Sequence, residues 1–175
     1  MPESQVKIIV RPLEKSDLGD IYLQWFEDPE IFKYLEIRNL TGDAALAHLQ
    51  HGQRTREWMQ YAICLADSGR LVGTTKLGPV KWRHGLSDLS TIIGARDVWG
   101  RGIGTEAVRQ TTEIAFREHG LRRLSAGIYG SNTKSLATYL RAGWFEEARL
   151  KDHYVFDGAL TDRVIVSCIN PARNP

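Results

Sequence analysis

The feature that most constrains the fold is a strand–helix–strand order in the middle of the chain. A β-type run at 87–94 is followed by a glycine-rich turn, a helical pattern from about 103 to 119, and a second β-type run at 122–129. Two neighbouring strands joined through a helix run parallel, and the crossover is right-handed in nearly all proteins. The sequence therefore predicts one parallel pair of strands.

The rest of the sheet is predicted to be antiparallel. Before the parallel pair, β-type runs alternate with polar turn segments, which indicates a meander: 59–66, 70–78 and 87–94. After it, runs at 144–156 and 160–169 are joined at Asp157-Gly158, a strong hairpin signal. The predicted fold class is α/β (α+β), with a mixed, mostly antiparallel sheet of about seven strands and helices on both faces. A parallel pair in such a sheet can diverge and open a cleft.

The N-terminal third predicts one strand and then helices. Residues 5–11 form the strand, which ends at Pro12. Ser16 can cap a helix whose apolar stripe comprises Leu18, Ile21, Tyr22, Trp25 and Phe26. Asp28-Pro29 is typical of an N-cap followed by proline, which would restart a short helix through Tyr34. Residues 43–58 are predicted to be helical, although the stretch HGQRTRE within them is also compatible with a loop.

Two later helices are each followed by a glycine. The helix at 103–119 carries an apolar face, with Glu106–Gln110 and Glu113–Arg117 on exposed i,i+4 rows. Gly120 is placed to end it in the left-handed conformation, and Gly143 follows the helix at 132–142 in the same way.

Composition limits the classes of function. The chain has 175 residues and a net charge of +2, which fits a single domain over 1–175 and gives no global reason to expect nucleic acid or an anionic membrane as partner. The two isolated cysteines, Cys64 and Cys168, are interpreted as core thiols and predict neither a disulfide framework nor a metal site. No charged-then-apolar leader opens the chain and no apolar run approaches ~18 residues, so a cytoplasmic protein is expected.

The segment Trp99–Thr105 is a candidate phosphate site. Its glycines, Gly100, Gly102 and Gly104, leave room for close approach of a ligand, while helix N-terminal amides and the charge of Arg101 attract an anion. The pattern is neither a P-loop nor a dinucleotide fingerprint. Taken alone, it is explained equally well by a tight turn that binds nothing.

A second group of residues follows on the helix at 132–142. Asn132 and Tyr139 are seven positions apart and share a helix face, with Ser135 between them. If the strands at 87–94 and 122–129 are neighbours, both helix N-termini flank one cleft and Tyr139 faces it. Each residue also has a structural explanation: Asn132 as an N-cap, Ser135 as a solvated residue, Tyr139 as a core aromatic.

These motifs together resemble the GNAT superfamily of acetyltransferases. VWGRGIGTEA is similar to its diphosphate-binding signature Q/R-x-x-G-x-G/A, NTKSLATYLRAGW to its second motif, and the opening RPLEKSDLGDIYLQWFEDPEIFKYL to the branch with ribosomal-protein N-terminal, spermidine and nucleotide-sugar acetyltransferases. The departure is Trp99, which stands where glutamine or arginine is usual and cannot supply a charge-assisted bond to phosphate.

The resemblance implies acetyl-CoA as co-substrate and no metal. Residues implied to contact it are Ile92 and Ile93, as a strand edge for the pantetheine, then Trp99, Gly100, Arg101, Gly102, Ile103, Gly104 and Thr105 around the diphosphate, and Asn132 and Ser135. Tyr139 is implied to be the general acid that protonates the departing thiolate, because a phenol stays protonated at neutral pH.

The general base and the acceptor stay open. Glu36 is the first candidate base, with a surface ion pair to Arg38 as the alternative explanation; His84, Asp88 and His153 are weaker candidates. The expected acceptor is a primary amine, on a nucleotide-linked amino sugar or a protein N-terminus. A homodimer is compatible with the sequence. The alternative function is a non-catalytic acyl-CoA-binding or regulatory module, against which the retention of Tyr139 argues.

Overall fold

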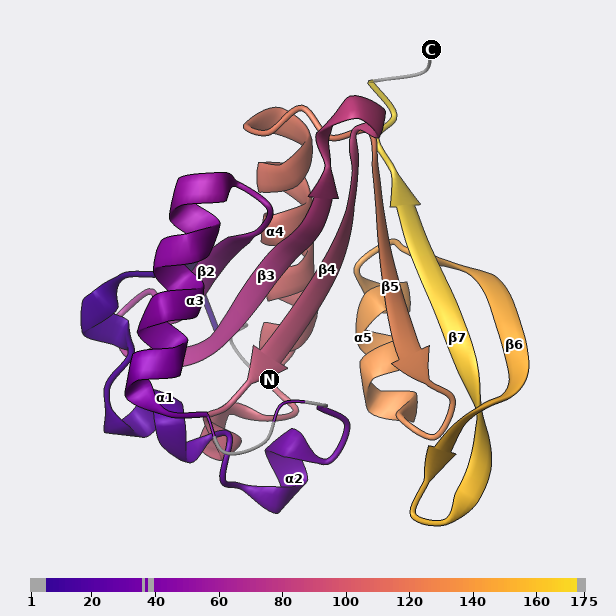
Figure 1. Ribbon diagram of the computed structural model, residues 1–175, viewed down its shortest axis with the longest axis horizontal. Helices are drawn as coiled ribbons and strands as arrows, with labels where there is room; N and C mark the ends of the chain where they lie inside the picture. The colour runs from indigo at the N-terminus through magenta and orange to yellow at the C-terminus, as the bar shows by residue number, and fades with distance from the viewer. Residues whose placement is uncertain (1–5, 36, 38–39, 173–175) are drawn as a thin grey trace, which may run out of the picture.

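The fold is built on one seven-stranded sheet with the strand order β1-β2-β3-β4-β5-β7-β6. The computed structural model describes residues 6–35, 37 and 40–172. Its strands are β1 (Ile8–Pro12), β2 (Met59–Leu65), β3 (Leu71–Lys81), β4 (Leu86–Ile93), β5 (Arg123–Tyr129), β6 (Phe145–Phe156) and β7 (Ala159–Ile169). Within these described residues, β4 and β5 form the only parallel pair, as the strand–helix–strand order predicts (Figure 1).

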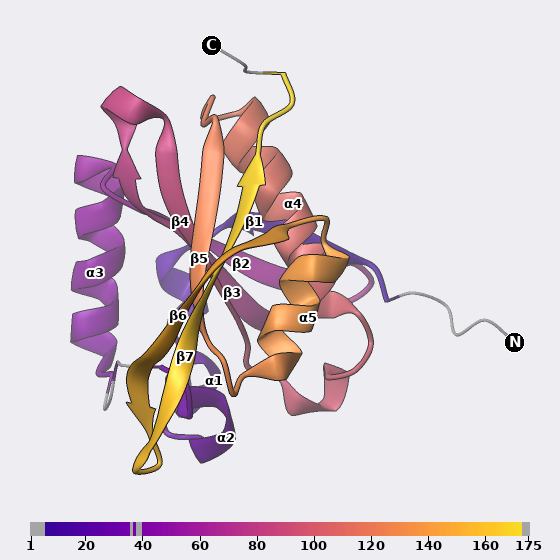
Figure 2. The same cartoon turned by 90° about the vertical axis from the view of Figure 1, so that its right-hand side faces the viewer.

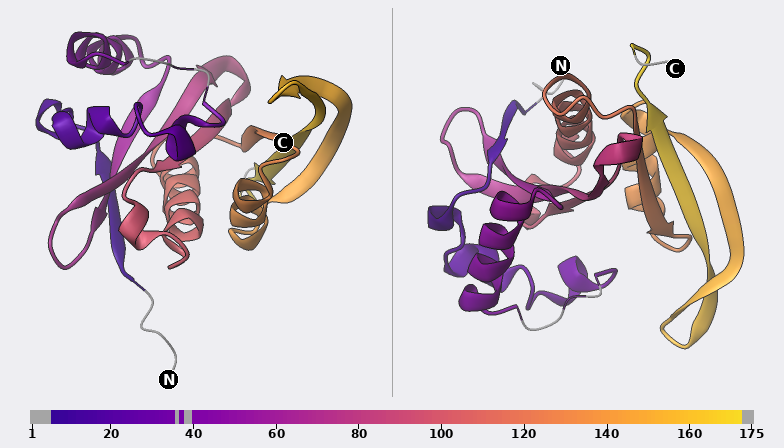
Figure 3. Two further views of the ribbon diagram at one scale, coloured as in Figure 1. Left: turned by 90° about the horizontal axis from the view of Figure 1, so that it is seen from below. Right: turned by 45° about the horizontal axis from the view of Figure 1, so that its top comes forward.

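Helices cover both faces of this sheet, which confirms the predicted fold class. The helices are α1 (Asp20–Gln24), α2 (Pro29–Phe32), α3 (Gly42–Thr55), α4 (Ile103–Arg117) and α5 (Thr133–Arg141). Figure 2 shows α3 on one side of the sheet and α4 with α5 on the other. In the left panel of Figure 3, the part of the sheet formed by β5, β7 and β6 is turned relative to β1–β4.

The main core lies between the sheet and the pair α4 and α5. Leu89 of β4, Leu124 of β5 and Val164 of β7 are almost fully buried there against Val108 of α4. Burying a Leu or Val side chain contributes about 1.5–3 kcal/mol each, so this layer holds the two halves of the sheet together. These residues also fix the faces of the strands: Asp88 and Arg163, next to core residues, point to the α3 face.

The N-terminal helices begin later than the sequence predicts. Ser16 does not cap a helix; it lies within a 3₁₀ turn at Lys15–Asp17. The Asp17 carboxylate accepts from the Glu14 amide at 2.8 Å and pairs with Arg11 at 2.7 Å, which stabilises this separate turn. Helix α1 then starts after Gly19. Asp28 does cap α2, since its side chain accepts from the Glu30 amide at 3.0 Å, as predicted.

Residues 43–55 are helical, as predicted, so the stretch HGQRTRE lies mostly in α3 and not in a loop; Arg56 ends α3 in the left-handed conformation. One further detail differs from prediction. Gln110 is not simply exposed: its side chain accepts from the Val10 amide and donates to the Ile8 carbonyl, each at 3.2 Å, and so ties α4 to the edge strand β1. The period of the sequence places Gln110 on the outer row, but β1 crosses that row.

The predicted glycine signals are confirmed. Gly120 and Gly143 have φ values of 63° and 92°, and the hairpin residues Asp157 and Gly158 have φ values of 49° and 76°. Cys64 and Cys168 are free thiols, buried and partly buried respectively. No helix among residues 6–35, 37 and 40–172 is long and apolar enough to cross a membrane.

Candidate active site

The site begins where β4 and β5 separate. Their pairing covers only Leu86–Asp88 with Arg123–Ser125, at the start of both strands. Beyond Asp88, β4 continues to Ile93 and β5 to Tyr129 with no residue pair between them in the described chain. Figure 1 shows the two strands diverging toward their carboxyl ends. The divergence leaves one edge of β4 open in the middle of the sheet.

The register of β4 decides which residues present main-chain groups to this gap. The Gly94 amide donates to the Val72 carbonyl of β3 at 2.9 Å, and Ile92 pairs with Thr74 in the same strand. Because hydrogen-bonding direction alternates along a strand, Ile92 directs its main chain to β3 and Ile93 directs its main chain to the gap. Of the two residues predicted to pair with a ligand, Ile93 is therefore the one that faces the opening.

Two side chains bind to carbonyls on the open edge of β4. The Tyr139 hydroxyl donates to the Leu89 carbonyl at 2.9 Å, and the Trp99 indole Nε1 donates to the Ile93 carbonyl at 2.9 Å. Each replaces a bond that a neighbouring strand would make. The carbonyls that these side chains bind, those of Leu89 and Ile93, are four residues apart on β4 and mark the two ends of its exposed edge.

The glycine turn presents unpaired amides at the same end of β4. Gly100 and Gly102 have φ values of 76° and 78°, and a Cβ at either would meet no atom within 4 Å. Gly102 is the N-cap of α4 and offers no side-chain cap; the first helical amide to find a partner is that of Glu106, which donates to Gly102. The preceding amides, at 103–105, face outward at the positive end of the helix dipole. This arrangement fits a phosphate group.

Helices α4 and α5 approach each other beside this turn. A Cβ at Gly104 would lie 3.3 Å from Thr138 and 3.8 Å from Ile93, so glycine allows the helix to pack close to α5 and the end of β4. At the start of α5, the Asn132 side chain accepts from the Ser135 amide at 3.2 Å. Both helix N-termini therefore flank the gap on one face of the sheet, as predicted from the motifs.

Tyr139 is held at the gap by ring packing and by its hydrogen bond to Leu89. Its side chain is 4% exposed and packs edge-on against Trp144, with ring centroids 4.9 Å apart. The Trp144 indole donates to Thr112 of α4 at 3.1 Å, which fixes the ring that supports Tyr139. Burial raises the pKa of Tyr139 well above its ordinary value, so the phenol keeps its proton at neutral pH. The residue can donate a proton but does not ionise by itself.

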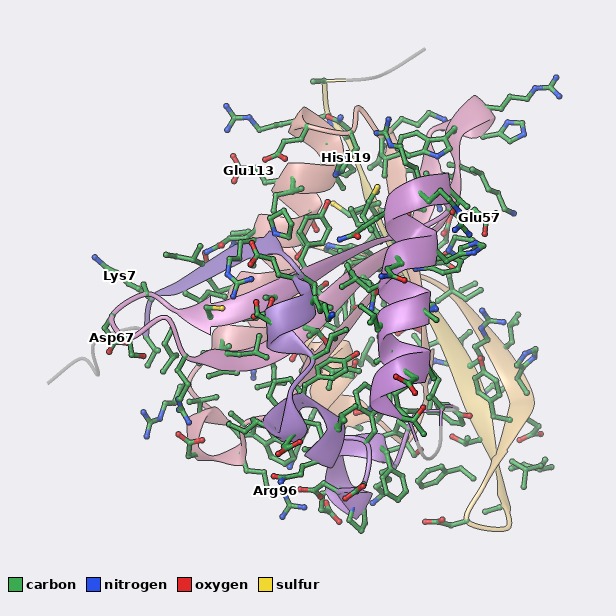
Figure 4. All side chains as sticks on the ribbon, turned by 60° about the vertical axis from the view of Figure 1, so that its left-hand side comes forward. Lys7, Glu57, Asp67, Arg96, Glu113 and His119 are labelled. Carbon is green, nitrogen blue, oxygen red and sulfur yellow. The ribbon has the colours of Figure 1, made fainter. Side chains whose placement is uncertain are left out.

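The N-terminal helices are attached to the glycine turn. Arg96, just before the turn, pairs with the Asp28 carboxylate that caps α2. The Trp25 ring lies against Gly94, where any Cβ would clash with ring atoms at 1.9–2.3 Å. In Figure 4, Arg96 lies at the α2 end of the molecule, whereas His119 lies at the opposite end of α4. These contacts place α1 and α2 beside the open end of the gap.

The α3 face of the sheet carries charged and aromatic side chains beside the gap. At the paired start of β4 and β5, Asp88 lines a polar pocket of about 260 Å³ together with Lys81 and Arg123. Burial raises the pKa of Asp88, although Arg163 and nearby lysines oppose the shift. Near the ends of β5 and β6, Tyr129 stacks on Tyr154 with centroids 4.3 Å apart.

The predicted acid–base candidates lie in different parts of the molecule, and among those described only Asp88 lies next to a residue that binds Tyr139. Glu36 lies outside the described residues. Asp88 lies on the α3 face next to Leu89, whose carbonyl binds Tyr139. His84 belongs to the turn before β4, at the closed end of the strand pair, and His153 is exposed on β6. Arg101 is exposed beside the glycine turn.

Sequence reasoning missed several residues that build the site. The indole bond of Trp99 to Ile93 and the fit of Trp25 on Gly94 were not predicted, because each depends on how the chain folds back on β4. The only available signal was the tryptophan at a position of the signature where it is unusual.

Comparison with known proteins identifies the family. Residues 7–144 match the acetyltransferase (GNAT) domain. The chain belongs to this acetyltransferase family. The match covers both the glycine turn and the helix that carries Tyr139, so it includes the gap and the amides beside it.

Two related proteins and two solved structures resemble this chain over most of its length. An uncharacterized N-acetyltransferase p20 of Bacillus licheniformis is 24% identical over 171 residues, 93% of both chains, and the probable N-acetyltransferase YjcK of Bacillus subtilis is 28% identical over 174 residues, 94% of both. Spermidine N-acetyltransferase from Vibrio cholerae, solved with CoA and spermine, has a TM-score of 0.83 at 18% identity, covering 95% of this chain and 96% of that one. Ribosomal-protein-S5-alanine acetyltransferase from Vibrio fischeri has a TM-score of 0.80 at 20% identity, with 96% of both chains covered.

Proposed function

We propose that this acetyltransferase transfers an acetyl group from acetyl-CoA to a primary amine, with the whole chain acting as one catalytic domain. The observation that carries the proposal is the combination of an open β4 edge, an uncapped helix N-terminus beside it and the Tyr139 hydroxyl on the same edge. A ligand with a diphosphate and an extended amide-bearing arm matches these features in order. The Vibrio cholerae structural neighbour, which was solved with CoA, supports this choice of co-substrate.

Each part of the site has one task. The amides at 103–105 and the dipole of α4 hold the diphosphate, with Arg101 adding positive charge. The Ile93 main chain pairs with the amides of the extended arm, and Asn132 at the start of α5 lies at its other side. Acetyl-CoA supplies an acetyl group activated as a thioester.

The transfer itself needs a free amine and a protonated leaving group. The amine nitrogen bonds to the acetyl carbon, the carbon–sulfur bond breaks, and the thiolate takes the proton of the Tyr139 hydroxyl. A base removes the surplus proton from the amine nitrogen. Donation by Tyr139 requires its hydroxyl to leave the Leu89 carbonyl, 2.9 Å away, and turn toward the sulfur.

The base is a carboxylate in this proposal. Glu36 remains the candidate from the sequence, and Asp88 is the carboxylate on the α3 face that lies next to Leu89 along β4. Glu36→Gln and Asp88→Asn separate the two. Loss of the base lowers kcat/KM and removes the acidic limb of its pH profile, whereas loss of a surface carboxylate leaves that limb in place.

A coupled thiol-release assay tests the function. Acetyl-CoA is incubated with the protein and a panel of amino sugars, peptides and polyamines, and free CoA is measured. We expect acceptor-dependent release and an acetylated product by mass spectrometry. Tight, stoichiometric acetyl-CoA binding with no acceptor-dependent release across the panel would instead favour a non-catalytic binding module.

A further inference from the structure

The Arg163 side chain fills space that β5 leaves open because it has a glycine, Gly127, at that position. Arg163 lies on β7 opposite Tyr129 of β5, on the α3 face of the sheet. Its guanidinium lies over Gly127, where a Cβ would stand 2.9 Å from both Nε and Nη2. Any side chain at 127 would push the guanidinium away. The bare backbone of Gly127 therefore determines where this charge lies.

The Arg163 guanidinium lacks a hydrogen-bond partner at its Nε. This atom is buried and makes no hydrogen bond within the described part of the chain. Neighbouring arginines differ: Arg123 of β5 pairs with Glu147, and Arg149 of β6 pairs with Glu146 at 3.0 Å. A buried polar group without a partner is rare in folded proteins, because it loses its water without compensation. A ligand that accepts hydrogen bonds would supply the missing partner.

The surroundings favour an anion over a cation. The Asp88 carboxylate interacts electrostatically with Arg163, Lys81 and Lys76, so three cations surround one acid. The Tyr154 ring lies 5.9 Å from the guanidinium carbon and shields it from solvent on one side. Among these groups the positive charges outnumber the negative one, and a carboxylate or phosphate can pair with the planar guanidinium through two parallel bonds.

The position of Arg163 corresponds to the acceptor side of the gap. Gly127 lies beyond Ser125, the last residue of β5 that pairs with β4, where these two strands have separated. The opposite face is closed by α4 and α5, which meet at Gly104 and Thr138. A co-substrate held by α4 fills the gap from that side, so the amine has to reach the acetyl group from the face of Arg163.

We propose that Arg163 binds an anionic group, a carboxylate or a phosphate, on the amine that this enzyme acetylates. The inference rests on the proposed function and narrows its acceptor class. It distinguishes this chain from an enzyme for polyamines, whose substrates carry no anion. Arg163 is a binding residue in this proposal and takes no part in the proton transfers.

Paired acceptors and four variants test the proposal. Each acceptor is compared with a partner lacking only the anion: an amino sugar phosphate with the free amino sugar, and an amino acid with its amide. Arg163→Gln removes the charge, Arg163→Lys keeps it without the planar fork, and Gly127→Ala displaces the guanidinium without removing it. Arg149→Gln, on the adjacent strand, is the matched control.

We expect Arg163→Gln and Gly127→Ala to lower kcat/KM for the anionic acceptor at least about tenfold, equivalent to 1.4 kcal/mol. Arg163→Lys should fall between them and the wild type. The neutral partner should change less than about twofold, as should all substrates with Arg149→Gln. The pair that shows the larger difference identifies phosphate or carboxylate as the source. Equal losses on both members of each pair, or a preference for spermidine over every anionic acceptor, would overturn the proposal.

An equilibrium measurement keeps the test independent of catalysis. The Arg163 Nε–H signal, assigned by its absence in Arg163→Gln, is followed by NMR during titration with inorganic phosphate and with acetate. A saturable shift that Gly127→Ala abolishes supports the anion site even if no acceptor is acetylated, in which case the proposed function fails alone. A signal that does not respond to either anion overturns the site, whatever the assay of acetyl transfer gives.

Discussion

Replacing Gly102 by valine should separate co-substrate binding from folding. Gly102 has a φ of 78°, and a Cβ there would touch no other atom of the described chain. The variant therefore suffers backbone strain but no steric clash with the protein. The left-handed conformation costs an L-residue roughly 1–2 kcal/mol. For a chain of this length, such a loss lowers Tm by about 2–8 °C, and the protein stays folded.

The loss of affinity for acetyl-CoA should be much larger than this loss of stability. The open space around Gly102 is where an anion would approach the amides at 103–105, and the valine methyl groups would occupy it. A hydrogen bond to a charged group contributes about 1.5–3 kcal/mol, so losing two of them weakens binding by about 3–6 kcal/mol. This corresponds to a Kd at least about 100-fold higher.

Titration calorimetry with acetyl-CoA measures the effect, and Gly143→Val provides the control. Gly143 also has a positive φ, 92°, with open space around it, but it follows the far end of α5. The Gly143→Val variant should lose a similar amount of stability and keep the wild-type affinity for acetyl-CoA. Near-wild-type affinity in folded Gly102→Val, or an equal loss in both variants, would refute the assignment of the phosphate site.

Three further outcomes follow from the same geometry. Tyr139→Phe should lower kcat about 100-fold and stability by about 1–3 kcal/mol with little change in acetyl-CoA affinity; a variant that keeps more than about half of kcat where chemistry limits the rate would show that water protonates the thiolate. Because burial raises the pKa of Asp88, its ionised form destabilises the fold at pH values above the ordinary Asp pKa. Asp88→Asn should therefore raise the urea midpoint of unfolding at pH 7, and this gain should vanish below about pH 3.9. An equal gain at both pH values would contradict the titration of Asp88. Trp99→Phe should lose the bond to Ile93, reduce stability by about 0.5–1.5 kcal/mol and raise the KM for acetyl-CoA, and an unchanged KM in steady-state kinetics would show that this carbonyl does not shape the site.

Local chemistry made much of the fold predictable. The hairpin at Asp157-Gly158, the Asp28 cap and the glycines after α4 and α5 are short-range signals, and the chain adopts each of them. The parallel pairing followed from the strand–helix–strand order, which admits few alternatives. Ser16 failed as a cap because Asp17, one residue on, bonds to the Glu14 amide instead.

The contacts that complete the site were not predictable in this way. Trp25 meets Gly94, Trp99 reaches back to Ile93, and Arg163 lies over a glycine on another strand. Each depends on a register or a crossing that the sequence does not encode locally. Besides the unusual Trp99, a glycine outside a turn, such as Gly94 or Gly127, is a signal of these contacts, and it can be interpreted only once the opposing side chain is placed.

A crystal structure of the protein with CoA tests the central claim most directly. We expect the diphosphate within hydrogen-bonding distance of the amides at 103–105, the pantetheine arm paired with the Ile93 main chain between β4 and β5, and the sulfur beside the Tyr139 hydroxyl. CoA bound outside this gap, or a gap that stays closed with Tyr139 directed away from the sulfur, would contradict it.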